Sequence, residues 1–190
     1  MSLMEATAVI RRAGNVQREK DDFYRTPPQC AHDLLDRESI SGGIWEPACG
    51  DGAISSVLES RGHRVLSTDL VDRGYGEPRR DFLLEQDLLA PNIITNPPFK
   101  LADQFILHSL ALGAQKVCMF LRLAFLEGRA RHTKLFMPHP PARVHVYSGR
   151  QTLWMGGHER ANEPRGGAIA FAWFVWDAAH SGAPELRWIA

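Results

Sequence analysis

The sequence has few cysteines and lacks the patterns typical of disulfide-stabilised or exported proteins. Its three cysteines, Cys30, Cys49 and Cys118, are odd in number, lie far apart and never occur as Cys-x-x-Cys. This spacing excludes a disulfide framework and a zinc knuckle, and it favours a reducing compartment. The first residues show no signal-peptide pattern, so we expect a cytoplasmic protein.

An excess of charge of one sign and long apolar segments are also missing. The 22 basic Lys and Arg residues balance 22 Asp and Glu residues, so any contact with nucleic acid must use a local basic patch. The longest apolar run, residues 167–176, is too short to cross a bilayer as a helix, and we expect no membrane partner. The histidines show no spacing typical of a metal site, so we assign no metal.

The composition is that of one globular domain. Hydrophobic residues make up 44% of the chain and charged residues 23%, which is ordinary for a globular protein. A length of 190 residues is enough for one domain with a full hydrophobic core. Residues 1–22 are polar and mixed in charge and predict an N-terminal arm. We expect residues 23–190 to form the single domain.

The segment from Ile44 to Asp69 predicts a nucleotide-binding βαβ unit. A short apolar strand runs into the loop Glu46–Gly52, a helix is predicted over residues 53–61, and a second strand ends in Asp69. This order is typical of nucleotide sites, in which glycines let the backbone approach the ligand. Asp69 can accept hydrogen bonds from two ribose hydroxyls. Taken alone, the glycines fit a tight strand-to-helix turn equally well.

Glu46 narrows the choice of ligand. Its carboxylate would repel a pyrophosphate but suits the amino end of a methionine-like ligand, and the loop lacks the third glycine of a dinucleotide site. We interpret this as favouring S-adenosylmethionine (SAM), which is cationic at its sulfonium and ammonium groups, over NAD. A short third strand is predicted over residues 81–83. Asp81 can accept from the amine of a cofactor adenine and Phe82 can pack on its ring, or Asp81 simply caps a turn.

A strand over residues 93–95 ends in Asn96-Pro97-Pro98-Phe99. Pro97 holds Asn96 in an extended conformation. The prolines have fixed φ and no N–H, and they predict free carbonyl acceptors in a stiff loop beside the Asn96 oxygen. Such a loop suits holding an amino group still while its nitrogen is alkylated. The alternative is a plain strand exit, since the chain contains two other Pro-Pro pairs.

The remaining segments alternate between helical and strand patterns. Thr26 is predicted to be an N-cap, with Pro27 at the first helical position. Alternating elements followed by two closing strands indicate an α/β sheet that is covered on both faces. The other predicted helices span residues 30–37, 101–112 and 128–136, and the other predicted strands span residues 117–121, 143–147 and 168–176.

Together these motifs resemble those of class I SAM-dependent methyltransferases, in the branch that methylates adenine N6. Tyr24-Arg25-Thr26-Pro27 is similar to the N-terminal motif of that branch, Glu46–Gly52 to its SAM loop, and Asn96–Phe99 to its catalytic (D/N/S)PP(Y/F) motif. The resemblance covers residues 24–176. It implies a Rossmann-like three-layer sandwich, with a mostly parallel seven-stranded sheet and an antiparallel C-terminal strand.

The resemblance also implies which residues form the site. Asp69 matches the acid that binds ribose, and Asp81 matches the acid that binds the adenine amine. The implied catalytic residues are Asn96, Pro97, Pro98 and Phe99, the last expected to stack on the target ring. The residues expected to hold SAM are Tyr24, Thr26, Glu46, Pro47, Ala48, Cys49, Gly50, Gly52, Asp69, Leu70, Asp81 and Phe82.

The order of the motifs resembles the gamma class of DNA adenine methyltransferases. Neither the insertion between the motifs nor the chain after the sheet is long enough for a target-recognition domain, so the closest resemblance is to compact phage, prophage or orphan enzymes. The expected reaction is methylation of adenine N6 in DNA. The alternatives are RNA adenine, a protein glutamine amide, or an idle SAM-binding module whose protein partner supplies recognition.

Two clusters of basic residues offer contacts to a phosphate backbone, with Trp154 as a stacking surface. Charge clusters are more often solvated faces, and this alternative stays open. The first cluster is Arg122, Arg129, Arg131, His132 and Lys134, and the second is Arg143, Arg150, His158, Arg160 and Arg165.

Overall fold

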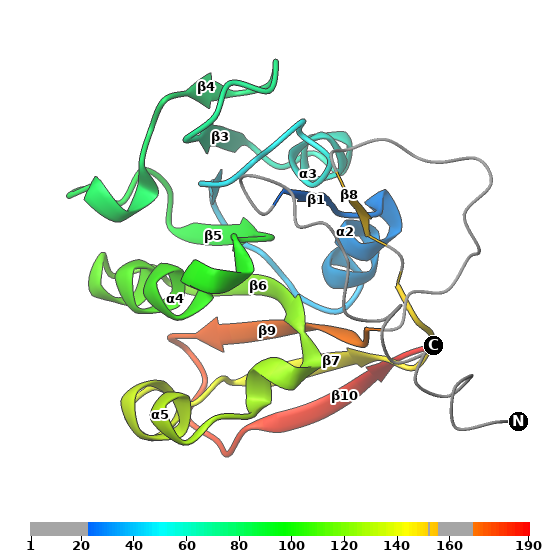
Figure 1. Ribbon diagram of the computed structural model, residues 1–190, viewed down its shortest axis with the longest axis vertical. Helices are drawn as coiled ribbons and strands as arrows, with labels where there is room; N and C mark the ends of the chain where they lie inside the picture. Colours follow the sequence, from blue (N-terminus) through cyan, green and yellow to red (C-terminus); the bar gives the residue numbers. More distant parts are fainter. Residues whose placement is uncertain (1–22, 152, 156–168) are drawn as a thin grey trace, which may run out of the picture.

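The alternating segments form a large sheet with helices on both faces (Figure 1). The computed structural model describes residues 23–151, 153–155 and 169–190. Short 3₁₀ turns cover Phe82–Leu84, Phe99–Leu101 and Leu123–Leu126, and a π-helical turn, His132–Phe136, continues α5. The strands and α-helices are β1 (Tyr24–Arg25), α2 (Pro28–Leu35), β2 (Ile44–Glu46), α3 (Ser55–Ser60), β3 (Val65–Asp69), β4 (Glu77–Pro78), β5 (Asn92–Thr95), α4 (Ala102–Ala111), β6 (Lys116–Arg122), α5 (Arg129–Arg131), β7 (Arg143–Tyr147), β8 (Trp154–Met155), β9 (Phe171–Asp177) and β10 (Glu185–Ile189).

The strand order brings the tips of the motif strands together. The large sheet runs β10-β7-β9-β6-β5-β2-β3-β4. Strands β2 to β6 are mutually parallel, and β9 lies antiparallel between β6 and β7. The order changes direction between β2 and β5, and open sheets of this kind bind ligands at the carboxyl ends of the strands beside such a point. Glu46, Asp69 and Asn96 lie at or just after these ends.

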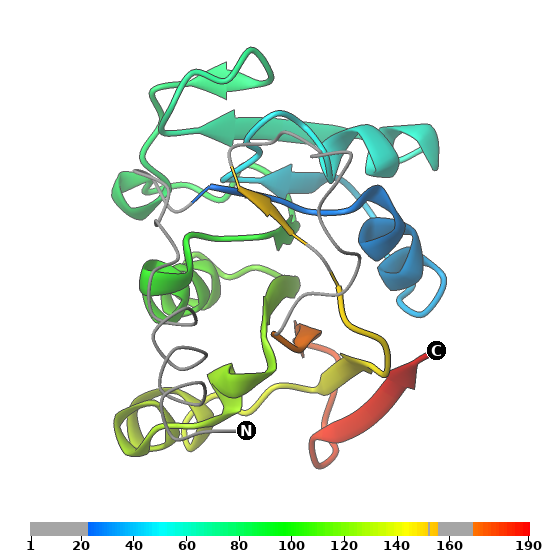
Figure 2. The same cartoon turned by 45° about the vertical axis from the view of Figure 1, so that its right-hand side comes forward.

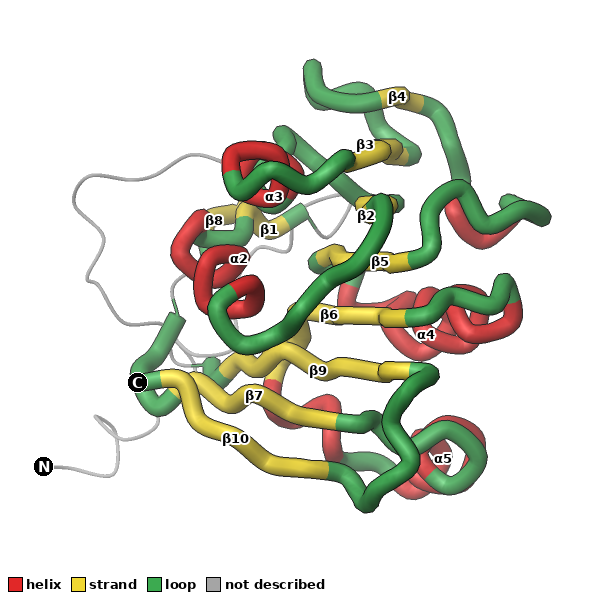
Figure 3. The backbone as a smooth tube through the Cα atoms, turned by 180° about the vertical axis from the view of Figure 1, so that it is seen from behind, coloured by secondary structure: helices red, strands yellow, loops and turns green. Residues whose placement is uncertain are grey.

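Both faces of the sheet are covered, because α2 and α3 lie on one side and α4 and α5 on the other (Figure 3). Along β6, Val117 and Met119 pack into the same core as Phe105 of α4. The intervening Cys118 and Phe120 pack into the core on the other face. This alternation is expected for a central strand of a three-layer α/β sandwich. The predicted Rossmann-like fold class is therefore confirmed.

Two predictions about strands were wrong. The large sheet has eight strands instead of seven, because β10 adds to its edge in parallel with β7. On that edge Leu186 is 51% exposed and Trp188 is 64% exposed, so β10 buries little of its apolar surface. The strand predicted over residues 81–83 is a 3₁₀ turn after Asp81, and the third parallel strand is β4.

A separate two-stranded ladder joins β1 to β8 in antiparallel orientation (Figure 2). Tyr24 pairs with Met155 and Arg25 pairs with Trp154, within a stretch that the sequence predicted as loop. Several predictions fall outside the described residues: the N-terminal arm of residues 1–22, the stacking role of the Trp154 side chain, and the phosphate contacts of His158, Arg160 and Arg165.

Thr26 does not cap α2, contrary to the prediction. Pro27 occupies the N-cap position and Pro28 begins the helix, where a missing N–H breaks no intrahelical bond. The Thr26 hydroxyl instead accepts a hydrogen bond of 2.9 Å from the Asn96 side chain. Thr26 is therefore part of the site rather than a helix cap.

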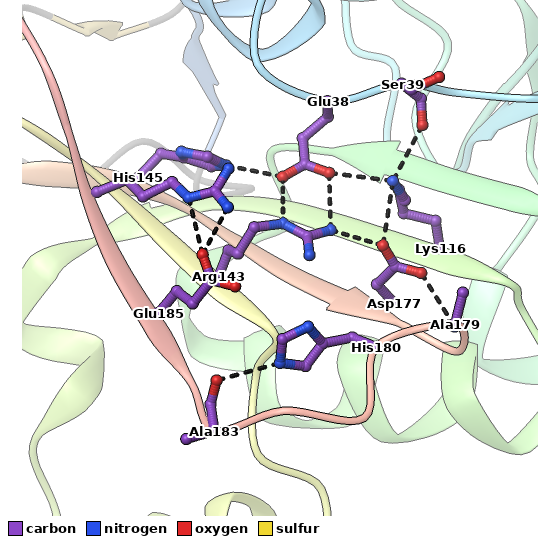
Figure 4. Close-up of polar contacts among 11 residues, drawn as sticks. Glu38, Ser39, Lys116, Arg143, His145, Asp177, Ala179, His180, Ala183 and Glu185 are labelled. Carbon is purple, nitrogen blue, oxygen red and sulfur yellow. Dashed lines mark hydrogen bonds and ion pairs between the residues drawn. The ribbon is translucent and has the colours of Figure 1, made fainter.

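A cluster of buried charged side chains links β6, β7 and β9 at the end of the strands opposite to Asn96 (Figure 4). Glu38 Oε1 accepts hydrogen bonds from Arg143 Nε at 2.6 Å and from His145 Nε2 at 2.8 Å. Glu38 Oε2 accepts from Lys116 Nζ at 3.0 Å, and Asp177 accepts from Arg143 at 2.6 Å. Arg143 is 9% exposed and is held by two carboxylates. The prediction that it contacts phosphate is therefore wrong.

Glu38→Gln is expected to lower the free energy of unfolding by about 3 kcal/mol near pH 7, because it takes a carboxylate away from buried cations. Burial raises the pKa of Glu38, but the hydrogen bonds from His145, Arg143 and Lys116 lower it more, so the pKa lies well below its ordinary value of 4.5. As the pH falls, the unfolded chain therefore takes up this proton first, and the stabilisation present above pH 4.5 is lost in acid.

Urea unfolding of the wild type and Glu38→Gln, at about pH 7 and about pH 3, measures this difference. The control is Glu127→Gln, an exposed position, which we expect to change the free energy of unfolding by less than about 0.5 kcal/mol. A gap between wild type and Glu38→Gln that is equally large at both pH values would contradict the assignment.

Candidate active site

A pocket of about 370 Å³ lies at the carboxyl ends of β2, β3 and β5, within the range of about 300–1,000 Å³ typical of ligand sites. All predicted cofactor residues line it except Gly50 and Gly52, and two predicted catalytic residues line it, Asn96 and Pro98. The cofactor residues that line it are Tyr24, Thr26, Glu46, Pro47, Ala48, Cys49, Asp69, Leu70, Asp81 and Phe82.

Asn96 is held at the pocket wall with its side-chain oxygen unpaired. Its Nδ2 donates to the Tyr24 carbonyl and to Thr26 Oγ1, each at 2.9 Å. Because a carbonyl can only accept, the Tyr24 contact identifies the nitrogen of the carboxamide. Asn96 Oδ1 is buried and has no hydrogen-bond partner within the described residues. A buried acceptor left unpaired costs about 1–3 kcal/mol, so this oxygen is placed to accept from a bound donor.

The rest of the predicted catalytic motif is only partly in the pocket. The Pro98 carbonyl accepts from the Leu101 amide at 2.8 Å, so the prediction that both proline carbonyls are free is wrong for Pro98. The Pro97 carbonyl receives no hydrogen bond from the described part of the chain. Phe99 does not line the pocket. Its ring lies 5.7 Å from that of Tyr24 and beneath the Arg122 guanidinium, and stacking on a target ring stays a prediction.

Glu46 is a carboxyl group buried in the pocket wall, 1% exposed. The Ser55 hydroxyl donates to it. Burial raises the pKa of Glu46 well above its usual value; the Ser55 hydrogen bond offsets part of that rise, and the charges of Asp69 and Asp51 add to it. A carboxyl in such surroundings retains its proton, and a neighbouring cation favours its ionised form. Glu46 therefore fits a cationic ligand group.

Asp69 holds the glycine loop in addition to lining the pocket. Its Oδ2 accepts from the Gly50 amide and its Oδ1 from the Val71 amide, each at 2.8 Å. A carboxylate oxygen accepts more than one hydrogen bond, so both oxygens retain capacity for ligand hydroxyls. The predicted contact to ribose is compatible with this geometry and stays a prediction.

Asp81 has the capping role that the sequence offered as its alternative. Its Oδ1 accepts from the Leu83 amide at 3.0 Å, and the residue also lines the pocket. Phe82 is 2% exposed, and its ring packs edge-on against Trp45 with centroids 5.1 Å apart. Phe82 therefore belongs to the core beneath the pocket, and any contact with an adenine ring is limited to its small accessible part.

The loop glycines are required by contacts within the protein. Gly50 and Gly52 have φ values of 58° and 81°. A Cβ atom on Gly50 would lie 2.4 Å from the Phe23 ring, and one on Gly52 would lie 2.5 Å from the Tyr75 ring. Aromatic side chains thus make the close approach that the sequence assigned to a ligand. Burial raises the pKa of the Cys49 thiol to about 12, which makes it a poor nucleophile.

Several residues that line the pocket were assigned no role from the sequence. Arg25 and Asp51 lie inside predicted motifs without an assigned contact, and the others lie outside the motifs. Arg25 forms an ion pair with Asp51 at 2.7 Å, and the Arg73 guanidinium lies 4.2 Å from the centre of the Phe23 ring. The sequence signal for such residues is their nearness to a motif, as for Lys100, which directly follows Phe99. The main lining residues missed are Phe23, Arg25, Asp51, Val71, Arg73, Arg80, Lys100, Leu101 and Phe105.

The first basic cluster is divided in the structure. Arg131 pairs with Asp103 at 2.8 Å and donates to two backbone carbonyls, so its predicted phosphate contact is wrong. Arg129, His132 and Lys134 are exposed and have no ion pair within the described ranges.

No helix in the described part of the chain is long and apolar enough to cross a membrane. No group of potential metal ligands is found among the same residues.

No protein-family model and no curated protein sequence matches this chain. Its fold, however, resembles solved structures. A protein of Listeria monocytogenes, provisionally assigned as a class I SAM-dependent methyltransferase, is 14% identical with a TM-score of 0.54. The match covers 84% of this chain but only 62% of that protein. A protein of Pyrococcus horikoshii, provisionally assigned as an RNA methyltransferase, is 14% identical with a TM-score of 0.58 and coverages of 92% and 98%.

A third similar structure contains a ligand. The magnesium protoporphyrin IX methyltransferase of Synechocystis, solved with bound SAM, is 14% identical over 79% of each chain, with a TM-score of 0.51. At such identities the similarity establishes the architecture. The chain has the class I methyltransferase fold, with one strand added at the edge of the sheet.

Proposed function

We propose that this protein binds SAM in the pocket and transfers its methyl group to an exocyclic amino nitrogen, with N6 of adenine in DNA as the target. The observation that carries the proposal is the buried Asn96 Oδ1, which is unpaired within the described residues. It is an acceptor whose orientation is held by two hydrogen bonds, and it belongs to a residue that lines the pocket. An amine is the donor that such an acceptor fits.

The residues of the pocket fit SAM chemically. Glu46 is a buried carboxyl whose charged neighbours within the described residues are the carboxylates Asp69 and Asp51, and it suits the ammonium end of the cofactor. Asp69, at the tip of β3, suits the ribose hydroxyls, and Asp81 suits the adenine amine. When bound, SAM supplies an electrophilic methyl group, and the transfer forms one C–N bond while one C–S bond breaks.

Asn96 and Pro97 would act on the amine rather than on the methyl group. The lone pair of an adenine amine is delocalised into the ring, so the nitrogen is a poor nucleophile. Asn96 Oδ1 and the Pro97 carbonyl accept hydrogen bonds from its two N–H groups and draw the nitrogen towards tetrahedral geometry. Positioning of this kind is a large part of catalysis. The surplus proton leaves the nitrogen after the transfer, so no strong base is required.

The target assignment rests on the form of the Asn96-Pro97-Pro98-Phe99 loop and is the finer part of the proposal. An adenine in a duplex must be flipped out to reach Asn96, which costs a few kcal/mol. RNA adenine is the second candidate, because the Pyrococcus protein of the same fold is assigned to RNA. A protein glutamine amide and an idle SAM-binding module with a protein partner are the remaining alternatives.

Transfer of tritium from labelled SAM to DNA lacking adenine methylation, to RNA and to a protein extract tests the proposal. We expect label in DNA, recovered as N6-methyladenine after hydrolysis to nucleosides. Label in RNA or in glutamine would replace the DNA assignment and keep the chemistry. SAM binding by calorimetry with no label in any substrate would contradict an enzymatic role.

A further inference from the structure

Arg122 is a partly buried cation for which the described residues supply no anionic partner. It ends β6, which pairs with β5, the strand that ends just before Asn96. Its Nε atom is buried and has no hydrogen-bond partner, and no ion pair involves Arg122 in the described part of the chain. Its guanidinium lies 4.6 Å from the centre of the Phe99 ring.

A desolvated charge is costly unless it is paired, and four other partly or fully buried arginines pair with a carboxylate. Arg122 pairs with no carboxylate in the described part of the chain, and it lies at the end of β6, beside the strand that leads to Asn96. Its missing anion is therefore expected to arrive with a ligand. The four pairs are Arg25–Asp51 at 2.7 Å, Arg80–Glu85 at 2.7 Å, Arg131–Asp103 at 2.8 Å and Arg143–Glu38 at 2.6 Å.

Lys100 supplies a second unpaired cation at the same place. It directly follows Phe99, it lines the pocket, and it is exposed. Within the described residues no carboxylate pairs with it. Arg122 itself does not line the pocket, so the anion that it lacks lies beside the cofactor site rather than in it.

We infer that Arg122 binds a phosphate of the target nucleotide, with Lys100 assisting, and that the pocket receives its amine from a polynucleotide. This inference rests on the proposed methyltransferase function. A planar guanidinium binds phosphate oxygens in pairs, whereas a glutamine amide in a protein brings no phosphate. When the guanidinium moves onto the phosphate it uncovers the Phe99 ring, which is then free to stack on the target base.

The test compares Arg122→Gln with Arg64→Gln. Arg64→Gln removes the same charge at an exposed position just before β3, at the end of that strand away from Asp69. The probe is a labelled random-sequence DNA 12-mer, bound to protein saturated with S-adenosylhomocysteine over a range of salt concentrations. Arg122→Gln is expected to weaken binding about tenfold and to reduce the salt slope by about one. It should leave SAM affinity within about twofold, and it should lower transfer to the 12-mer more than transfer to deoxyadenosine, which has no phosphate.

Each other outcome has a definite meaning. Equal 12-mer binding by both variants overturns the inference, and weaker SAM binding in Arg122→Gln alone would assign Arg122 to the cofactor carboxylate instead. If Arg122→Gln lowers transfer to the 12-mer and to deoxyadenosine by the same factor, Arg122 acts only by supporting the Phe99 ring. If the 12-mer binds with the expected dependence on Arg122 but no substrate is methylated, the phosphate site stands and the proposed reaction fails.

Discussion

Asn96→Ala is expected to lower the methyl-transfer rate at saturating substrate by about 10²–10³-fold, which is the usual effect of removing one preorganised polar contact to a reacting group. The substitution removes Oδ1, which has no partner among the described residues, and with it one of the two acceptors proposed to draw the amine towards tetrahedral geometry. SAM affinity should change by less than about threefold, because the cofactor contacts assigned to Glu46 and Asp69 remain. Single-turnover transfer and calorimetric SAM titration measure the two effects.

Two variants make this result interpretable. Asn92→Ala changes the same residue type at the start of β5, the strand that ends just before Asn96. The Asn92 side chain donates to the Ser41 and Gly43 carbonyls, and this variant should reduce stability without reducing the transfer rate. Thr26→Val removes one of the two acceptors that hold Asn96 Nδ2 and should lower the rate only about tenfold. A rate for Asn96→Ala that equals that of Asn92→Ala would contradict the assigned role.

SAM binding is expected to release a proton from Glu46 and to strengthen as the pH rises. Burial raises the pKa of Glu46 in the free protein, so the carboxyl is protonated below that raised value. A bound cation lowers the pKa again. Between the two values the association constant should rise by up to about tenfold per pH unit, the limit for one linked proton. Calorimetry in buffers of different ionisation enthalpy counts the released proton.

Glu46→Gln isolates this effect, because the amide has nearly the same shape and cannot ionise. Its SAM affinity should show no such pH dependence and should fall below that of the wild type as the pH rises. Glu127→Gln, exposed and outside the pocket, is the control and should behave like the wild type. Proton release that persists in Glu46→Gln would assign the titration to another group, with Asp69 and Asp51 as the nearest charges.

The N-terminal segment has a larger part in the site than its sequence indicates. Phe23 lies against Gly50, Arg25 pairs with Asp51, and the Tyr24 carbonyl helps to hold Asn96. The β1–β8 ladder ties the same segment to the chain that follows β7. The residues that hold the Asn96 side chain and those that contact the glycine loop are therefore neighbours in one short stretch.

Local patterns in the sequence were sufficient to predict most of the fold. Buried strands such as β6 and β9 contain continuous apolar runs, and helices such as α4 repeat their apolar positions with helical spacing, so each could be read within one window of residues. The order of these elements, with the acid and amide positions at the strand tips, also placed most of the pocket residues correctly. Edge strands were missed, because β4 and β10 bury little apolar surface.

The sequence by itself thus determined the α/β class, the loop after β2 and the place of Asn96 just after a buried strand. Only the tertiary structure decided which atom of Asn96 is held within the described residues, since its nitrogen donates to Thr26, 70 positions away. Arg143 is likewise excluded from a phosphate role by its ion pair with Glu38, 105 positions away. A sequence pattern reports on neighbours within a turn or strand, whereas hydrogen bonds and ion pairs between distant segments exist only once the sheet has formed.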